Sequence, residues 1–307
     1  MRILILGNTG FVGNAVLNNF SNEGAHQIFT YSRENGQNLL DYQKFENFLK
    51  EIQPEIIINC SAHVGSVHYG LKYPANIFHD NMQMILNIFL AVSKVCQNAK
   101  MINLISNCVY PMNADIQKEN ELWNGSPHNT ALSYASVRRM ILIISESYYK
   151  QYKIKSVNLI LPGIYGPGNH LNIERVHALD GIIIRMIKAY KNNDREFEVW
   201  GSGNPIREWC YIDDLTNLIS IVVNKNLEFD EPLNLGQNKG YSIGEISKIT
   251  ASLLDYNGEI IYNTNYADGA AIKVLGNDNF LKHFNEFNFT DIKVGIKNTI
   301  DHIINKI

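Results

Sequence analysis

The stretch "RILILGNTGFVGNAV", residues 2–16, decides the fold. It starts as an apolar run typical of a buried strand and ends as the first turns of an amphipathic helix. Three glycines in the spacing G-x-x-G-x-x-G occupy the turn between the two. Glycine there lets the backbone approach a pyrophosphate, and the helix N-terminus offers free N–H groups and a positive dipole end. We therefore expect a dinucleotide site rather than only a tight turn, contacted by Gly7, Gly10, Phe11, Val12 and Gly13.

Short apolar runs alternate with longer amphipathic stretches through the first half of the chain. The predicted strands are residues 2–6, 27–31, 55–59, 101–106 and 156–161, and the predicted helices are residues 11–24, 42–52, 76–96 and 131–152. Gly24 and Pro54 stand where helices should stop. This alternation indicates parallel strands joined by helices, so the predicted class is α/β, with a Rossmann-type doubly wound parallel sheet.

The pattern changes after residue 165. We expect residues 1–165 to form the dinucleotide-binding domain and residues 166–307 to form mainly a smaller C-terminal α/β substrate-binding region, with the chain crossing back near residues 205–240. Asp213 and Asp214 precede an apolar helical stretch and are expected to cap it.

Composition excludes several classes of protein. The net charge of −3 gives no positive field that would attract nucleic acid or an anionic membrane. No apolar run approaches the roughly 20 residues that span a bilayer, and the N-terminus is too short in apolar residues for a signal peptide. The four cysteines lie far apart without metal-binding or disulfide spacing. We expect a cytoplasmic protein with reduced thiols, no metal site, no nucleic-acid partner and no membrane partner.

The end of the second predicted strand bears on the choice of dinucleotide. An NAD site usually has an acidic residue here, whereas an arginine suits the 2′-phosphate of NADP. The sequence has Ser32 and Arg33, and Glu34 comes one place too late. NADP(H) is therefore the expected cofactor, with Arg33 on its phosphate. Asp41 either contacts the adenine or caps the next helix.

A second group of candidate residues follows the fourth predicted strand. Ser106 and Cys108 come at its end, and Tyr134 and Arg138 are four residues apart on the next predicted helix, so they share a face. The carboxyl ends of parallel strands form the ligand crevice of a doubly wound sheet. Free tyrosine ionises near pH 10, so a neighbouring cation that stabilises phenolate makes it a better acid–base group.

Together these motifs resemble the extended short-chain dehydrogenase/reductase family, and more narrowly its GDP-fucose synthase group. The stretches that carry the resemblance are "SAHVGSVHYGLKYPANIFHDN" (61–81), "SNCVYP" (106–111), "YGPGNHLNIERVHAL" (165–179) and "WGSGNPIREWCYIDDL" (200–215). The resemblance implies an NADPH-dependent oxidoreductase that reduces C4 of a GDP-4-keto-6-deoxy hexose or heptose for surface polysaccharides, with 3,5-epimerisation as a second activity.

The resemblance also implies roles for individual residues. Ser106 would hydrogen-bond the sugar carbonyl, Tyr134 would donate its proton with Arg138 beside it, and Cys108 and His177 would be the acid–base pair of epimerisation. The residues implied in binding the nucleotide sugar are Arg185, Trp200, Arg207 and Lys273.

Two positions depart from the family pattern. Arg138 stands where the family has lysine, and its planar fork is not equivalent to an ammonium group. Gly163 stands where the family usually has asparagine, so one polar contact near the substrate is missing. Arg139 cannot substitute for Arg138, because it points to another helix face.

Two alternatives remain open. One is an NAD-dependent nucleotide-sugar 4-epimerase or dehydrogenase, which Arg33 argues against. The other is a non-catalytic dinucleotide-binding protein that senses redox state, for which Arg138 would be the mark of lost chemistry. The apolar helices at residues 76–96 and 131–150 resemble those that pair in dimers of this family, so a homodimer is expected.

Overall fold

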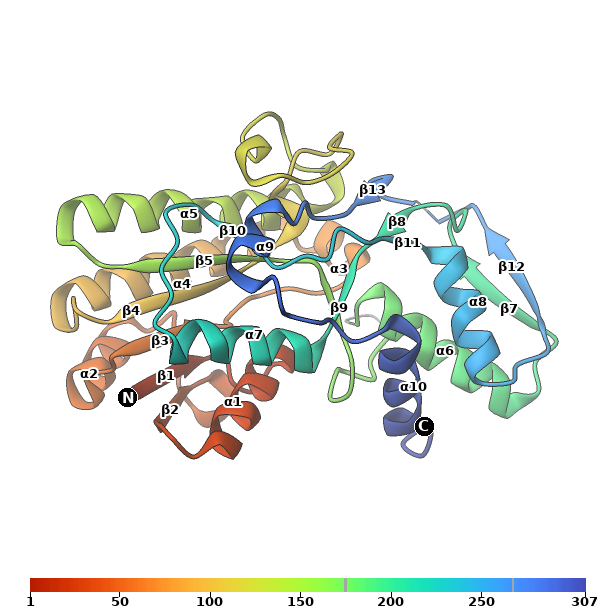
Figure 1. Ribbon diagram of the computed structural model, residues 1–307, viewed down its shortest axis with the longest axis horizontal. Coiled ribbons are helices and arrows are strands. Elements are labelled where there is room, and N and C mark those ends of the chain that lie inside the picture. Colours follow the sequence, from red (N-terminus) through yellow and green to blue (C-terminus); the bar gives the residue numbers. More distant parts are fainter. Residues whose placement is uncertain (174–175, 267) are drawn as a thin grey trace.

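A computed structural model describes residues 1–173, 176–266 and 268–307. Its centre is a sheet in which all neighbouring strands pair in parallel (Figure 1). In spatial order the strands are β10 (Leu233–Asn234), β5 (Ser156–Leu161), β4 (Lys100–Ser106), β3 (Ile56–Asn59), β1 (Arg2–Leu6) and β2 (Gln27–Tyr31). The order reverses between β1 and β3, so the crevice for a ligand is expected beyond the ends of these two strands.

Helices cover both faces of this sheet (Figure 1). One face carries α2 (Tyr42–Ile52), α4 (Pro74–Val95) and α5 (Leu132–Tyr152), and the other carries α1 (Phe11–Glu23) and α7 (Ile212–Asn224). Alternate residues of β1 point to opposite faces. Ile3 and Ile5 join the core beneath α1 and α7, whereas Leu4 and Leu6 join the core beneath α2 and α4. The Rossmann-type fold class predicted from the sequence is therefore confirmed.

The remaining elements form a smaller α/β region beside the carboxyl ends of the strands (Figure 1). Its strands are β7 (Glu196–Trp200) paired with β12 (Glu259–Asn263), and β11 (Tyr241–Ser242), β8 (Ile206–Arg207) and β13 (Ile272–Lys273) in one small sheet. Its helices are α6 (Ala178–Asn192), α8 (Ile243–Leu253) and α10 (Ile292–Ile303). A two-stranded link, β6 (Gly163–Tyr165) with β9 (Trp209–Tyr211), joins the two parts, and α3 (Val67–Lys72) and α9 (Asp278–Phe284) flank them.

The chain returns to the central sheet after this region begins. Helix α7 packs against α1, and β10 pairs with β5 at the edge of the sheet. The domain boundary at residue 165 stays a prediction. The capping role expected for Asp213 and Asp214 is wrong, because α7 begins at Ile212 without a side-chain cap. The Asp214 carboxylate instead accepts hydrogen bonds from the backbone N–H and the hydroxyl of Thr290, which hold the segment before α10.

Within the described ranges, each helix is either too short or too polar to cross a lipid bilayer.

Candidate active site

The glycine turn leaves room for a ligand next to the backbone. Gly7 has φ +75°, which other residues rarely adopt, and its N–H donates to the Tyr31 carbonyl at 3.0 Å. A Cβ on Gly13 would lie 2.2 Å from the Gly7 carbonyl oxygen, so only glycine permits this packing of helix on strand. Helix α1 follows from Gly10 without a side-chain cap, which leaves the N–H groups of its first turn free of side-chain partners. This cradle fits a dinucleotide pyrophosphate.

The corner after β2 also fits an adenosine with a 2′-phosphate. Ser32 is buried, and its hydroxyl oxygen has no hydrogen-bond partner within the described chain. Arg33 begins a short 3₁₀ turn, Arg33–Asn35, and its side chain is exposed. Asp41 caps α2 by accepting from the Lys44 N–H at 3.2 Å. The capping alternative for Asp41 is thus observed, and its contact with a cofactor stays a prediction.

Arg138 points into the protein rather than toward bulk water. Its side chain is only 3% exposed, and its Nη2 donates to the Ser61 carbonyl, just beyond the end of β3, at 2.8 Å. The guanidinium carbon lies 5.2 Å from the centre of the Tyr134 ring. The Nε–H is buried and has no partner among the described residues, so one donor stays available to a ligand. The cation is therefore fixed beside the phenol at the switch point of the sheet.

Arg139 faces elsewhere, as its spacing predicted. Its Nε donates to the Val109 carbonyl at 2.6 Å, and its guanidinium lies over the ring of Trp123.

Ser106 and Cys108 lie where the sequence analysis expected them, at the end of β4 and in the 3₁₀ turn that follows. The Ser106 hydroxyl oxygen accepts from the Cys108 N–H at 3.4 Å. Burial raises the pKa of the Cys108 thiol, while Lys273, Ser106 and Arg138 act in the opposite direction. The thiol is therefore held in its protonated form near neutral pH.

Lys273 and Arg207 face each other on paired strands. They are register partners in β13 and β8. Burial lowers the pKa of Lys273, with Cys108 opposing and Arg207 adding to the effect, and burial lowers the pKa of Arg207 to about 10. Burial, Lys273 and Arg207 together also lower the pKa of His128. Among the described residues, no carboxylate makes a salt bridge with Arg207 or Lys273. Two neighbouring cations of this kind favour the binding of an anion such as a diphosphate.

Strand β13 is tied to the turn that carries Cys108. Gln117 donates its N–H to the Val274 carbonyl at 2.8 Å, accepts from the Gly276 N–H, and donates its side-chain amide to the Asn107 carbonyl at 3.3 Å. Glu208, which is fully buried, accepts from the Leu275 N–H at 2.7 Å. These bonds fix the position of Lys273 relative to Cys108.

Arg185 and Trp200 form a separate, layered group. The Arg185 guanidinium lies 4.2 Å from the Trp200 ring centre and donates to the Glu198 carbonyl at 2.7 Å. The indole of Trp200 stacks on the Tyr266 ring at 5.0 Å. Trp200 remains partly exposed, so this group offers an aromatic surface beside a cation.

His177 immediately precedes α6 and its side chain is exposed. Desolvation by the surrounding protein lowers the pKa of His177, and His170 adds to this shift. The pairing of Cys108 with His177 stays a prediction. Glu174 and Arg175, within the stretch that carried the resemblance, lie outside the described residues.

Sequence reasoning missed three members of this region. The Ser61 carbonyl anchors Arg138, His128 lies near Lys273 and Arg207, and Trp209 occupies the space beside Gly163. A main-chain acceptor carries no signal in the sequence. His128 and Trp209 approach the site only through contacts between distant segments.

Comparison with known proteins identifies the family of the chain. The NAD dependent epimerase/dehydratase family matches residues 3–236. GDP-L-fucose synthase of Dictyostelium discoideum is 26% identical over 306 residues, covering 98% of this chain and 95% of that relative. GDP-L-colitose synthase of Yersinia pseudotuberculosis is 27% identical over 308 residues, covering 100% and 99%.

A solved GDP-L-fucose synthetase from Naegleria fowleri is similar over 99% of this chain and 93% of its own, with 25% identity and a TM-score of 0.88, and it has also been solved bound to NADP. The resemblance to GDP-fucose synthases within the extended short-chain dehydrogenases/reductases is confirmed, and the expectation of an NADP-dependent oxidoreductase agrees with these relatives. With most of its length matched and the glycine turn in place, the chain belongs to the NAD dependent epimerase/dehydratase family.

Proposed function

We propose that this chain is an NADPH-dependent reductase that acts at C4 of a GDP-4-keto-6-deoxy hexose or heptose, in the synthesis of sugars for surface polysaccharides. The single observation that carries the proposal is the buried Arg138, anchored on the Ser61 carbonyl and lying 5.2 Å from the Tyr134 ring centre. A fixed cation beside a phenol stabilises the phenolate that forms when tyrosine gives up a proton.

Each of these residues has a separate role in the reduction of the carbonyl. NADPH, when bound along the glycine turn, supplies the hydride. The Ser106 hydroxyl hydrogen-bonds the C4 carbonyl oxygen, and Tyr134 transfers its phenolic proton to that oxygen as the carbon is reduced. Arg138 stabilises the phenolate left behind, and its unpartnered Nε–H is free to bond the cofactor or substrate. The exposed Arg33 supports NADPH over NADH, because guanidinium pairs well with the 2′-phosphate.

The substrate's diphosphate is assigned to Arg207 and Lys273, whose side chains come from paired strands. The guanine or its ribose is assigned to the surface formed by Arg185 and Trp200. The non-catalytic alternative takes Arg138 as the mark of lost chemistry, and the inward position of its guanidinium beside the Tyr134 ring argues against it.

Epimerisation beside the ketone is the second candidate activity. It needs one group that takes a proton and one that gives it back, and such pairs are found where environments push two pKa values apart. Desolvation by the surrounding protein raises the pKa of Cys108 and lowers the pKa of His177. These directions support His177 as the base and Cys108 as the acid, with substrate bridging the two.

We also propose a homodimer in the cytoplasm. Helices α4 and α5 pack side by side and expose large apolar residues, namely Phe78, Leu86 and Leu90 on α4 and Ile143 and Tyr149 on α5. Exposed apolar side chains on two neighbouring helices are suited to packing against a second copy of the same helices. All four cysteines are free thiols, which agrees with a reducing compartment. Sedimentation equilibrium should give twice the chain mass, and a monomer at micromolar concentration would contradict the dimer.

The test of the proposed function uses the purified protein, NADPH and a GDP-4-keto-6-deoxy sugar. Absorbance at 340 nm should fall, and the product should carry deuterium beside C4 when the reaction runs in D₂O if epimerisation accompanies reduction. Absence of NADPH oxidation with every GDP-keto sugar tried would refute the reductase. Oxidation without deuterium uptake would refute only the epimerase.

A further inference from the structure

The pairing of β6 with β9 brings Gly163 against the side chain of Trp209. Gly163 and Trp209 are register partners, and the Gly163 N–H donates to the Glu208 carbonyl at 3.1 Å. A Cβ on Gly163 would lie 2.9 Å from Trp209 Cδ1 and 3.2 Å from Trp209 Nε1. The φ angle of Gly163 is not in the left-handed region, so the backbone alone does not demand glycine here. Glycine is required because the Trp209 indole occupies the space that a Cβ would need.

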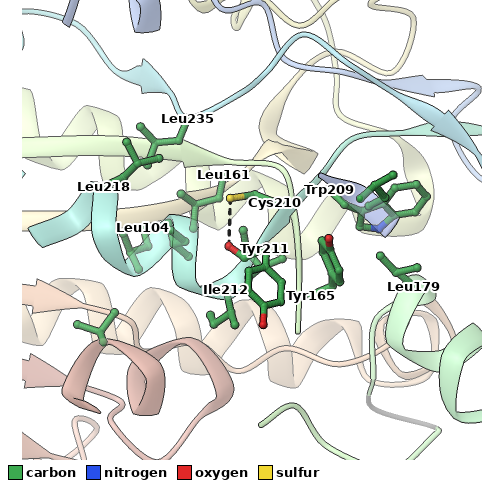
Figure 2. Packing of buried hydrophobic residues seen from close by; sticks show 14 of the residues in the cluster. Leu104, Leu161, Tyr165, Leu179, Trp209, Cys210, Tyr211, Ile212, Leu218 and Leu235 are labelled. Carbon is green, nitrogen blue, oxygen red and sulfur yellow. Dashed lines mark hydrogen bonds between the residues drawn. The ribbon is translucent and has the colours of Figure 1, made fainter. Parts of the chain in front are cut away.

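The indole belongs to a strand that pairs close to the end of the central sheet. Gly163 is two residues beyond Leu161, and Leu161 is the register partner of Ser106. Figure 2 shows Trp209 beside Leu179, in the first turn of α6 and two residues after His177. Trp209 is therefore paired just beyond the strand end that lies beside Ser106, and it belongs to the same buried cluster as Leu179.

The polar edge of the indole has no protein partner. Trp209 is 6% exposed, and no described residue accepts a hydrogen bond from its Nε1–H. A largely buried indole N–H usually finds an acceptor, so this N–H is available to a ligand oxygen.

We propose that Trp209 is a specificity-determining residue whose indole N–H donates a hydrogen bond to an oxygen of the substrate's sugar, and that Gly163 is required to make room for the indole. This inference rests on the proposed function, because it takes the ligand to be a nucleotide sugar. The indole N–H is a neutral donor that lies in the plane of the indole ring, so it suits a sugar oxygen in that plane. The diphosphate is bound by the cations of Arg207 and Lys273.

The test compares a ligand that has a sugar with one that lacks it. Calorimetry measures binding of GDP-mannose and of GDP to the unmodified protein and to Trp209→Phe, which removes the N–H and keeps an aromatic ring. Loss of one neutral hydrogen bond should weaken GDP-mannose about three- to tenfold and leave GDP within about twofold. Gly163→Ala, which must displace the indole, should weaken GDP-mannose at least as much. Trp123→Phe is the matched control, because Trp123 is 54% exposed and packs on Arg139.

The outcomes separate this inference from the proposed function. The inference is overturned if Trp209→Phe and the unmodified protein bind GDP-mannose with equal affinity. It is also overturned if Trp209→Phe loses affinity for GDP and for GDP-mannose by the same factor. If the protein binds GDP-mannose but oxidises NADPH with no keto sugar, the proposed reductase activity is refuted. The calorimetric comparison of Trp209→Phe with the unmodified protein still tests the role of the indole. If the unmodified protein binds neither ligand, both proposals fall. Thermal unfolding of each variant confirms that it is folded.

Discussion

Replacing Arg138 by methionine removes the cation beside Tyr134 while keeping a side chain of similar length. At the 5.2 Å between the guanidinium and the phenol ring, and with an effective dielectric constant of about 20, the attraction for a full negative charge is about 3 kcal/mol. At 1.36 kcal/mol for each tenfold in rate, this corresponds to a loss of about 200-fold. Tyr134 is only half-buried, so solvent screening reduces the effect, and we expect kcat to fall about 30- to 200-fold.

The assay is NADPH oxidation at 340 nm, with NADPH affinity measured separately by fluorescence titration. Arg138→Lys keeps the charge and should retain kcat within about fivefold. Tyr134→Phe removes the proton donor. The double variant with Arg138→Met should have nearly the same kcat as Tyr134→Phe alone, because the two residues act as one unit. A methionine variant with more than half of the original kcat would refute the electrostatic role. A gain of tenfold or more in Arg138→Lys would instead favour the non-catalytic alternative.

Three further predictions concern the cofactor turn and the buried charges. Arg33→Ala should raise KM for NADPH about 10- to 100-fold and leave KM for NADH nearly unchanged, and equal effects on both would contradict its contact with the 2′-phosphate. Gly13→Ala should abolish dinucleotide binding in a titration with NADPH, because its Cβ would lie 2.2 Å from the Gly7 oxygen. Burial raises the pKa of Asp180 from 3.8 to about 7, so the folded protein holds an extra proton between these values and stability falls as pH rises through this window. Urea unfolding should therefore show that the free energy of unfolding decreases from pH 5 to pH 8. This decrease should be smaller by about 1–4 kcal/mol in Asp180→Asn, and an equal decrease in both proteins would refute this account.

Much of the fold follows from local patterns along the chain. The apolar runs at residues 2–6, 27–31 and 156–161 agree with β1, β2 and β5 at both ends. Strand β1 is buried over residues 3–6 and is apolar there, whereas β2 lies at the edge of the sheet and only its last residue, Tyr31, is buried. Gly24 closes α1 with φ +64°, as expected of a glycine that ends a helix. Strand β10 could not be predicted, because two residues carry no periodicity.

The candidate site could be predicted only where its residues share one element. Tyr134 and Arg138 are four residues apart on a helix, so their contact follows from helical geometry. The approach of Lys273 to Cys108 depends on the hydrogen bonds of Gln117 and Glu208, which join segments distant in the sequence. Asp214 shows the limit of local rules. An acidic residue early in a helix suggests a cap, yet its carboxylate is used by Thr290 from another part of the chain.

The oxygen that holds Arg138 belongs to the main chain of residue 61. Every amino acid presents the same carbonyl at that point, so point substitution at residue 61 leaves the acceptor chemically intact. A genetic screen for lost activity should consequently recover changes in Arg138 and Tyr134 more often than changes at residue 61, which act only if they displace the backbone. During evolution, an exchange between lysine and arginine at position 138 would need no accompanying change at position 61, which lowers the barrier to such drift.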